Sequence, residues 1–145
     1  MPGSNNTPLD LNMAIIEADI ITAGTCLSES KDKQPKVAKY LRGLAGYHIQ
    51  QACEKLIKIQ IYANINKVDY KQIYKHDLSD LVSYASSQGV VIVMPKFIKD
   101  HLQIITSWEA EGRYDIHIVV KTNTIQRYLE VLQRWFADMK ESGYK

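Results

Sequence analysis

The sequence predicts an all-α protein, folded as an antiparallel up-and-down bundle of four to five helices. Apolar residues recur every three to four positions over most of the chain, which is the period of an amphipathic helix. The alternation that marks a half-buried strand is nearly absent. The connections between periodic stretches are short, which favours antiparallel neighbours around a shared core.

The first expected helix spans Leu11 to Leu27, and the second spans Val37 to Ala63. A charged, proline-bearing connection separates them, and Pro35 fits just before a helix but not within one. Gly43 and Gly46 weaken the second helix by roughly 1 kcal/mol each relative to alanine and permit close approach of another backbone. The inward stripe of the first helix is Met13, Ile16, Ile20, Ala23 and Leu27.

A polar and aromatic connection, NINKVDYKQIYKHD, follows the second helix and has room for a short helical turn. Asp77 is a typical N-cap for a third helix over residues 78 to 87, and Gly89 stops it. The VVIVM segment after it can be interpreted as a strand, but it has no partner strand in the sequence. Because Pro95 follows, we expect the segment to lead into the next helix.

The fourth expected helix comprises FIKDHLQIITSW, residues 97 to 108, and the fifth starts near Asn123 or Thr124. Both carry an apolar stripe at helical spacing. Large aromatic residues fall on these stripes, which favours a role in the core or at a dimer contact over a base-stacking platform. They are Trp108, Tyr128, Trp135 and Phe136.

Length and composition fit one globular domain over residues 1 to 145, with a flexible start of about ten residues. The chain is 46% hydrophobic and 23% charged. Its formal net charge is +2, which is too small to indicate a nucleic-acid-binding protein. Cys26 and Cys53 lack metal or redox spacing, so we expect buried free thiols. Glu17 and Asp19 interrupt the first apolar run, which argues against a signal peptide or membrane span and favours a cytoplasmic protein.

Polar side chains interrupt the second helix between Arg42 and Lys58. His48 shares its helical face with Ala45, Ile49, Ala52, Cys53, Leu56 and Ile59, so a titratable ring faces a packing surface. Arg42 adds a permanent cation six positions earlier. In one continuous helix these two side chains point about 120° apart, so a kink at Gly43 or Gly46, or a phosphate spanning two chains, would be needed for joint action.

Three blocks in a fixed order together resemble the HEPN domain, the helical module named for higher eukaryotes and prokaryotes nucleotide-binding. They are GYHIQQACEKLIK at 46 to 58, YKHDLSDLV at 74 to 82 and EGRYD at 111 to 115. The resemblance implies a bundle that commonly forms a homodimer. It also implies a binding site for nucleotide or RNA, for which the matching positions are Gln51, Lys55, His76, Arg113 and Tyr114.

The resemblance leaves two functions open. One is a module that binds nucleotide or RNA, or docks a nucleotidyltransferase-type partner. The other is a metal-independent endoribonuclease toxin, paired with a nucleotidyltransferase-type antitoxin, that uses Arg42 and His48 as the family's spaced arginine and histidine. Histidine would then handle the proton of the RNA 2′-hydroxyl or of the leaving oxygen, while arginine stabilises charge on the phosphate. Neither function implies a cofactor or metal.

Each candidate residue also has a purely structural interpretation. His48 can be an interior histidine bonded to Asp77, Tyr114 or a backbone carbonyl, and Arg42 a solvated residue near a helix start. His76 then packs outside the helix that Asp77 caps. Two ion pairs complete these interpretations: Arg113 with Glu109, Glu111 or Glu54, and Glu54 with Lys58 on an exposed face.

Overall fold

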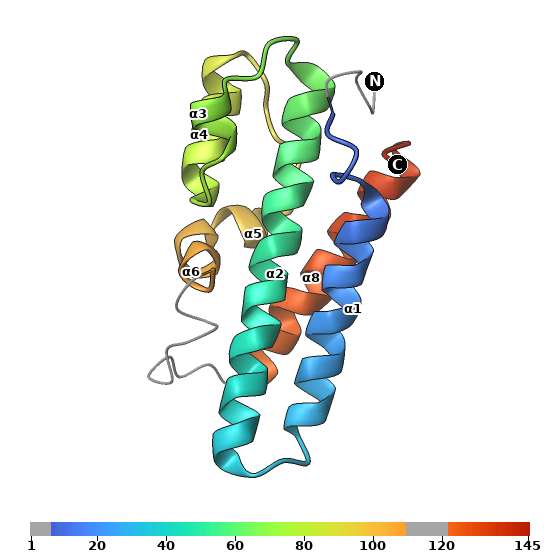
Figure 1. Ribbon diagram of the computed structural model, residues 1–145, viewed down its shortest axis with the longest axis vertical. Coiled ribbons are helices and arrows are strands. Elements are labelled where there is room, and N and C mark those ends of the chain that lie inside the picture. The colour runs from blue at the N-terminus through green and yellow to red at the C-terminus, as the bar shows by residue number, and fades with distance from the viewer. Residues whose placement is uncertain (1–6, 110–121) are drawn as a thin grey trace.

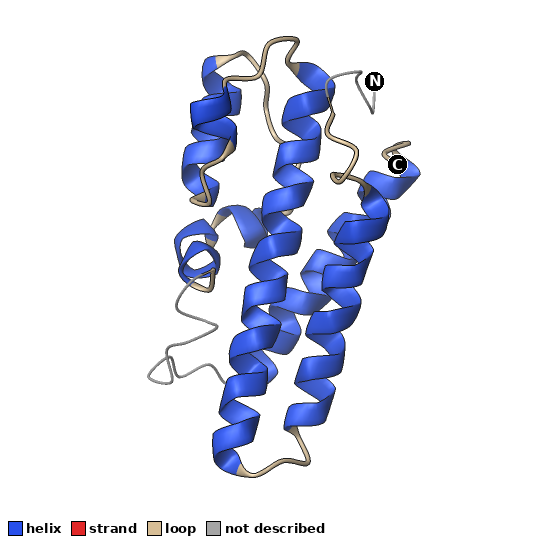
Figure 2. Ribbon diagram, viewed as in Figure 1, coloured by secondary structure: helices blue, strands red, loops and turns tan. Residues whose placement is uncertain are grey.

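The computed structural model describes residues 7–109 and 122–145, and its regular structure there is entirely α-helical (Figure 2). The predicted all-α class is therefore confirmed. Seven helices lie within these two ranges instead of the four to five expected, because the second connection forms a short helix and the fourth predicted helix is divided. They are α1 Met13–Ser30, α2 Pro35–Asn64, α3 Tyr70–Ile73, α4 Leu78–Ser87, α5 Lys96–Lys99, α6 Leu102–Ser107 and α8 Thr122–Glu141.

Three long helices, α1, α2 and α8, form the body of the molecule. Figure 1 shows α1 running antiparallel to both of the others. Of the short helices, α4 and α6 pack against α2, α3 packs against α4, and α5 packs against α8. Each long helix buries the apolar stripe that its sequence predicts, and full burial of one such aliphatic side chain contributes about 2 kcal/mol. Fully buried members of this core include Ile16, Leu27, Ile49, Leu56, Ile125, Leu132 and Trp135.

The long helices begin and end close to the expected positions. Asn12 caps α1 by accepting a hydrogen bond from the Ile15 amide at 3.0 Å, so the helix starts two residues later than predicted and ends three later, at Ser30. Pro35 occupies the first turn of α2, where its missing N–H costs nothing, and α2 extends to Asn64. The Met13 amide also donates to the Lys145 carbonyl at 2.9 Å, which joins α1 to the C-terminus.

Gly46 lies where α2 meets the Trp108 indole. A Cβ atom added at Gly46 would come within 3.2 Å of that ring, a tighter contact than side chains ordinarily make. The expected close approach at this glycine therefore exists, but the approaching group is a side chain and not a backbone. α2 continues as α-helix through Gly43 and Gly46 without a break.

The α4 helix spans Leu78–Ser87 as predicted. The Asp77 carboxylate accepts a hydrogen bond from the Asp80 amide at 3.1 Å and so caps the helix. Gly89 follows with a φ of +79°, a conformation that favours glycine and ends the helix. The capping interpretation of Asp77 is confirmed.

The VVIVM segment has no regular secondary structure and pairs with no strand among the described residues. Buried Gln60 bonds both backbone groups of Val93, accepting from its N–H at 2.8 Å and donating to its carbonyl at 3.0 Å. The Trp135 indole N–H donates to the same carbonyl at 2.9 Å. Side chains of α2 and α8 thus replace the partner strand that the backbone would otherwise require.

The fourth predicted helix is interrupted between α5 and α6. The His101 ring contacts the Phe97 carbonyl through Nδ1 at 2.6 Å, while the His101 amide donates to the Ile98 carbonyl at 3.0 Å. A ring nitrogen therefore occupies the acceptor that the backbone N–H would use in a continuous helix. This local competition explains why the chain turns there.

Candidate functional site

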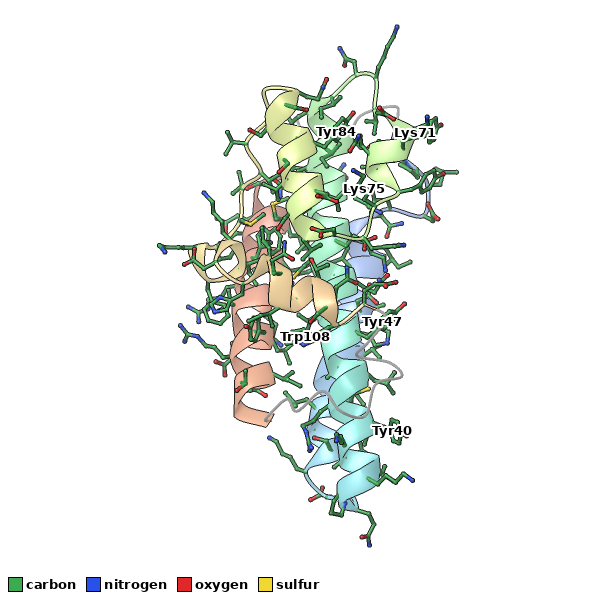
Figure 3. All side chains as sticks on the ribbon, turned by 90° about the vertical axis from the view of Figure 1, so that its left-hand side faces the viewer. Tyr40, Tyr47, Lys71, Lys75, Tyr84 and Trp108 are labelled. Carbon is green, nitrogen blue, oxygen red and sulfur yellow. The ribbon has the colours of Figure 1, made fainter. Side chains whose placement is uncertain are left out.

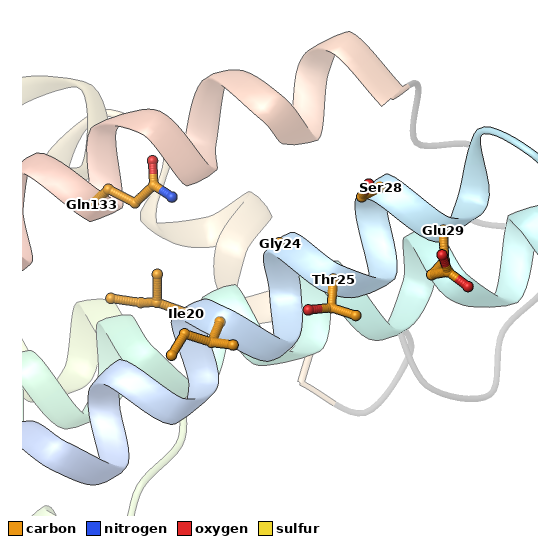
Figure 4. A pocket seen from close by; sticks show the side chains of 7 residues that line it. Ile20, Gly24, Thr25, Ser28, Glu29 and Gln133 are labelled. Atoms are coloured by element: carbon orange, nitrogen blue, oxygen red, sulfur yellow. The ribbon is translucent and has the colours of Figure 1, made fainter.

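One hollow lies between α1 and α8 and has few reactive or charged groups in its lining (Figure 4). It measures about 360 Å³ and is lined by Ile20, Ile21, Gly24, Thr25, Ser28, Glu29 and Gln133. Among the described residues, its lining includes no lysine, arginine or histidine, and a single carboxylate, Glu29, which already pairs with Lys33 at 3.4 Å. Nothing in this lining suits an anionic ligand.

Polar side chains instead form a continuous row on α2, which we call the α2 polar strip. It comprises His48, Gln50, Gln51, Glu54, Lys55 and Lys58. Two carboxylates organise it, one from α1 and one from α2 itself. Three positions predicted from sequence, Gln51, Lys55 and His76, lie on the strip or bond directly to it.

The first carboxylate is Asp19, a buried residue of α1. Its two oxygens contact different α2 side chains: Oδ1 lies 2.9 Å from His48 Nδ1, and Oδ2 accepts from Lys55 Nζ at 2.5 Å. His48 therefore bonds a carboxylate of α1, and not Asp77 or a carbonyl as its structural interpretation supposed. The His48 side chain keeps 24% of its surface exposed, so its ring is not sealed inside the bundle.

The second carboxylate is Glu54, and it is buried too. Oε1 accepts from Gln50 Nε2 at 2.9 Å and lies 3.0 Å from His76 Nδ1, while Oε2 accepts from Lys58 Nζ at 2.8 Å. The Glu54–Lys58 pair was predicted, but its placement on an exposed face was wrong. Burial raises the pKa of Glu54, yet the hydrogen bond and positive charge of Lys58, together with hydrogen bonds from Gln50 and His76, outweigh it and leave that pKa below its ordinary value.

Gln50 ties the second cluster to the loop before α4. It is completely buried, donates to the His76 carbonyl at 3.3 Å, and accepts from Gln51 Nε2 at 2.8 Å through its own Oε1. These bonds satisfy the polar groups of the buried Gln50 side chain, which would lower the stability of the fold if they were left without partners. They also hold the backbone of His76 in place, although its side chain is 59% exposed.

The two clusters meet at one hollow, which we call the Lys–Tyr pocket. It has a volume of about 180 Å³ and is lined by Pro8, Asp10, Leu11, Glu54, Lys55, Lys58, Tyr62, Ile73 and Tyr74. Lys55 and Lys58 belong to different clusters but both border it. The pocket therefore combines two ammonium groups, each held by a buried carboxylate, with two phenol rings.

Arg42 and His48 are not aligned on α2. Six residues of continuous helix separate their positions by about 9 Å along the axis and about 120° around it. α2 is continuous helix through Gly43 and Gly46, so these glycines do not interrupt the segment that carries the pair. Arg42 is half-buried, and joint action with His48 on one phosphate would require a second chain.

Other expected features have mixed outcomes. Arg113 and Tyr114 lie outside the described residues, and so do residues 1–6 of the start that we expected to be flexible. Cys53 is buried, and burial raises the pKa of its thiol, whereas Cys26 is only half-buried. Trp108, Tyr128 and Trp135 are core residues as predicted.

The sequence did not indicate the roles of Asp19 and Gln50 in the site, nor the burial of Glu54. Asp19 did leave a signal, because it stands three residues after Ile16 and four before Ala23, on the buried face of α1. A carboxylate at such a position requires a partner. The sequence did not reveal which partner.

Within residues 7–109 and 122–145, His, Cys, Asp and Glu nowhere gather in threes suited to a metal ion. The helices of these ranges include none with the length and apolarity that crossing a membrane would need. Comparison of the chain with protein-family models, curated proteins and solved structures finds no match.

Proposed function

We propose that this chain is a HEPN-like module that binds a nucleotide or RNA at the Lys–Tyr pocket, acting as a homodimer and able to dock a nucleotidyltransferase-type partner. One observation carries the binding proposal. Two lysines and two tyrosines line the same hollow, and each lysine is fixed by a buried carboxylate. Phosphate attracts ammonium groups, and a nucleobase stacks on a phenol ring.

The charge of the pocket defines what kind of ligand fits. The described lining contains two lysines, Lys55 and Lys58, and two carboxylates, Asp10 and Glu54, so their formal charges cancel. Attraction for phosphate is therefore weak, and stacking on Tyr62 or Tyr74 supplies a large share of the affinity. A nucleotide, which offers both a phosphate and a base, suits this lining better than inorganic phosphate.

A matched pair of tyrosine variants tests the proposal. Tyr74 lines the pocket, whereas Tyr40 is exposed near the opposite end of α2 (Figure 3). Calorimetric titration with adenosine monophosphate should show saturable binding that weakens about tenfold in Tyr74→Ala and is unchanged in Tyr40→Ala. Inorganic phosphate should bind more weakly than the nucleotide. Absence of saturable binding to wild type would overturn the proposal.

The homodimer has its own measurement. Sedimentation velocity over a range of concentrations should show a species of twice the chain mass. A monomer at every concentration would remove the dimer from the proposal without affecting the pocket. Co-expression with a nucleotidyltransferase-type protein encoded beside this chain, followed by co-purification, tests the partner.

One contact favours the alternative function, a metal-independent ribonuclease toxin. The Asp19 carboxylate orients the His48 ring through Nδ1, and Nε2 makes no hydrogen bond with the described residues. A carboxylate-oriented histidine of this kind can act as a general base toward a 2′-hydroxyl. Arg42, on another face of α2, would then serve the active site of a second chain.

Expression of the chain alone distinguishes the two functions. If the protein is a ribonuclease, wild type arrests growth and cleaves total RNA, and both His48→Ala and Arg42→Ala abolish these effects. If it is a binding module, wild type and both variants behave alike. Lys39→Ala, which removes a cation from the same half of α2, serves as the matched control for Arg42→Ala.

A further inference from the structure

We infer that the ligand is single-stranded and spans at least two nucleotides, because α3 presents two tyrosines over two adjoining hollows. This inference rests on the proposed function and specifies its ligand. The Lys–Tyr pocket would hold one base, and a second hollow beyond Tyr62 would hold the next.

The two α3 tyrosines form an exposed aromatic platform. Tyr70 and Tyr74 lie one helical turn apart, with ring centroids 5.9 Å apart and ring planes inclined by 23°. Their exposed fractions are 70% and 69%, so neither ring contributes to the core. Two large rings held in parallel and left open to solvent are what stacking on a nucleobase requires.

The platform is fixed in position although α3 has only four residues. Ile73 is buried and anchors the helix to the core. The Asp69 carboxylate caps α3 by accepting from the Lys71 amide at 2.9 Å, and the Asp69 amide donates to the Tyr84 hydroxyl of α4 at 2.8 Å. A platform that is already ordered loses little conformational entropy when it binds.

Two hollows adjoin at Tyr62, and each contains one platform tyrosine. Tyr74 lines the Lys–Tyr pocket of about 180 Å³. The second hollow measures about 280 Å³ and is lined by Tyr62, Asn66, Lys67, Val68 and Tyr70. Each hollow is therefore lined by an α3 tyrosine, the shared Tyr62 and at least one lysine. Two adjoining hollows with the same kind of lining fit two successive nucleotides of one strand.

Cations beside the platform suit the connecting phosphate. Lys67 and Lys71 form no ion pair with the described residues, unlike Lys55 and Lys58. Lys75 lies 3.9 Å from Asp80, with both side chains exposed, so that pair is loose. Lys67 lines the second hollow itself. Lys71 and Lys75 each directly follow a platform tyrosine in the sequence and lie at the α3 end of the molecule (Figure 3), so they add positive charge around the platform.

A base-paired duplex does not fit this arrangement. Its bases are stacked on one another and their faces are covered, so a pair of tyrosines cannot reach them without opening the helix. Unpaired nucleotides expose those faces. The chemistry of the platform therefore selects single strands and reads no sequence.

Titration with ligands of one and two nucleotides tests the inference. The dinucleotide ApA carries one phosphodiester charge, whereas adenosine monophosphate carries about 1.5 to 2 negative charges near pH 7. Charge alone would therefore favour the mononucleotide. We expect ApA to bind at least tenfold more tightly. Tyr70→Ala should abolish this gain without changing the affinity for the mononucleotide, while Tyr74→Ala should weaken both ligands.

Control measurements separate this inference from the proposed function. Tyr40→Ala should match wild type with both ligands, and an RNA duplex should bind more weakly than a single strand of the same length. If ApA and the mononucleotide bind equally, or if Tyr70→Ala matches wild type, the two-nucleotide site is refuted while the pocket remains. If neither ligand binds, the proposed function fails as well, and the platform is instead a contact for another protein.

Discussion

Asp19 and Glu54 are both buried carboxylates that hold one lysine and one histidine, but they connect different parts of the molecule. Asp19 belongs to α1 and bonds His48 and Lys55 on α2. Glu54 bonds Lys58 on its own helix and His76 in the loop before α4. The first carboxylate therefore joins two helices of the body, and the second attaches a loop to one of them.

The two clusters also differ in how completely each carboxylate is satisfied. Glu54 receives an additional hydrogen bond from buried Gln50, whereas Asp19 depends on two partners alone among the described residues. When a buried carboxylate loses a hydrogen-bond partner, the loss of stability is larger if fewer other partners remain. The Asp19 cluster should therefore be the more sensitive to substitution.

The largest effect is expected from Asp19→Ala. This change leaves the Lys55 and His48 side chains without their carboxylate at the α1–α2 contact, and should lower the free energy of unfolding by about 3 kcal/mol. Urea denaturation measures it. Asp32→Ala, at an exposed position after α1, should change stability by less than about 0.5 kcal/mol. An equal loss in both variants would deny Asp19 its structural role.

Glu54→Gln should cost less, about 2 kcal/mol near neutral pH, and should change the response to acid. Because the pKa of Glu54 is lower in the folded protein than its ordinary value of 4.5, ionised Glu54 stabilises the fold above pH 4.5. That contribution is lost as the pH falls from 4.5 through the lower folded value. The stability difference between wild type and variant should therefore shrink over this range.

Denaturation curves between pH 3 and 7 follow this difference. Glu17→Gln, at an exposed position on α1, provides the control and should show no such trend. A difference between wild type and Glu54→Gln that is constant with pH would mean that the ionised form of Glu54 is not favoured by folding.

Substitution of the lysine in each cluster should give losses of stability that differ by about 1 kcal/mol. Lys55→Met removes a bond between helices and leaves Asp19 with His48 alone, so we expect a loss of about 1.5 kcal/mol. Lys58→Met removes a pair one turn apart within α2, and Gln50 and His76 still satisfy Glu54, so about 0.5 kcal/mol is expected. Methionine keeps most of the packing of each aliphatic stem. Thermal unfolding of the two variants side by side would reveal a reversed order.

The two histidines should show the smallest difference between the clusters, about 0.5 kcal/mol. His48 is the less exposed of the two, and His48→Ala should cost about 1 kcal/mol, whereas His76→Ala should cost at most about 0.5 kcal/mol because its ion pair is largely solvated. Chemical denaturation at pH 7.5 compares them. A larger loss in His76→Ala would mean that the contact of the loop before α4 with Glu54 stabilises the fold more than the contact of His48 with Asp19.

Local patterns predicted most of the helices because their causes lie within a few residues. The apolar stripes, the Asp77 cap and the stop at Gly89 act over one or two turns, so α1, α2, α4 and α8 appear within three residues of their expected bounds. The fourth helix was predicted without its interruption, since the competing contact comes from a side chain, the His101 ring, that can also face away from Phe97.

The site divides in the same way. Sequence alone determined that α2 carries a polar strip and that Glu54 and Lys58 pair, because four residues of helix bring their side chains together whatever surrounds them. Only the tertiary structure decided that Glu54 is buried, and that Asp19 bonds His48 and Lys55, which lie 29 and 36 residues away along the chain. Contacts at such separations depend on how one helix is rotated and shifted against another, and the packing of the whole core sets that rotation.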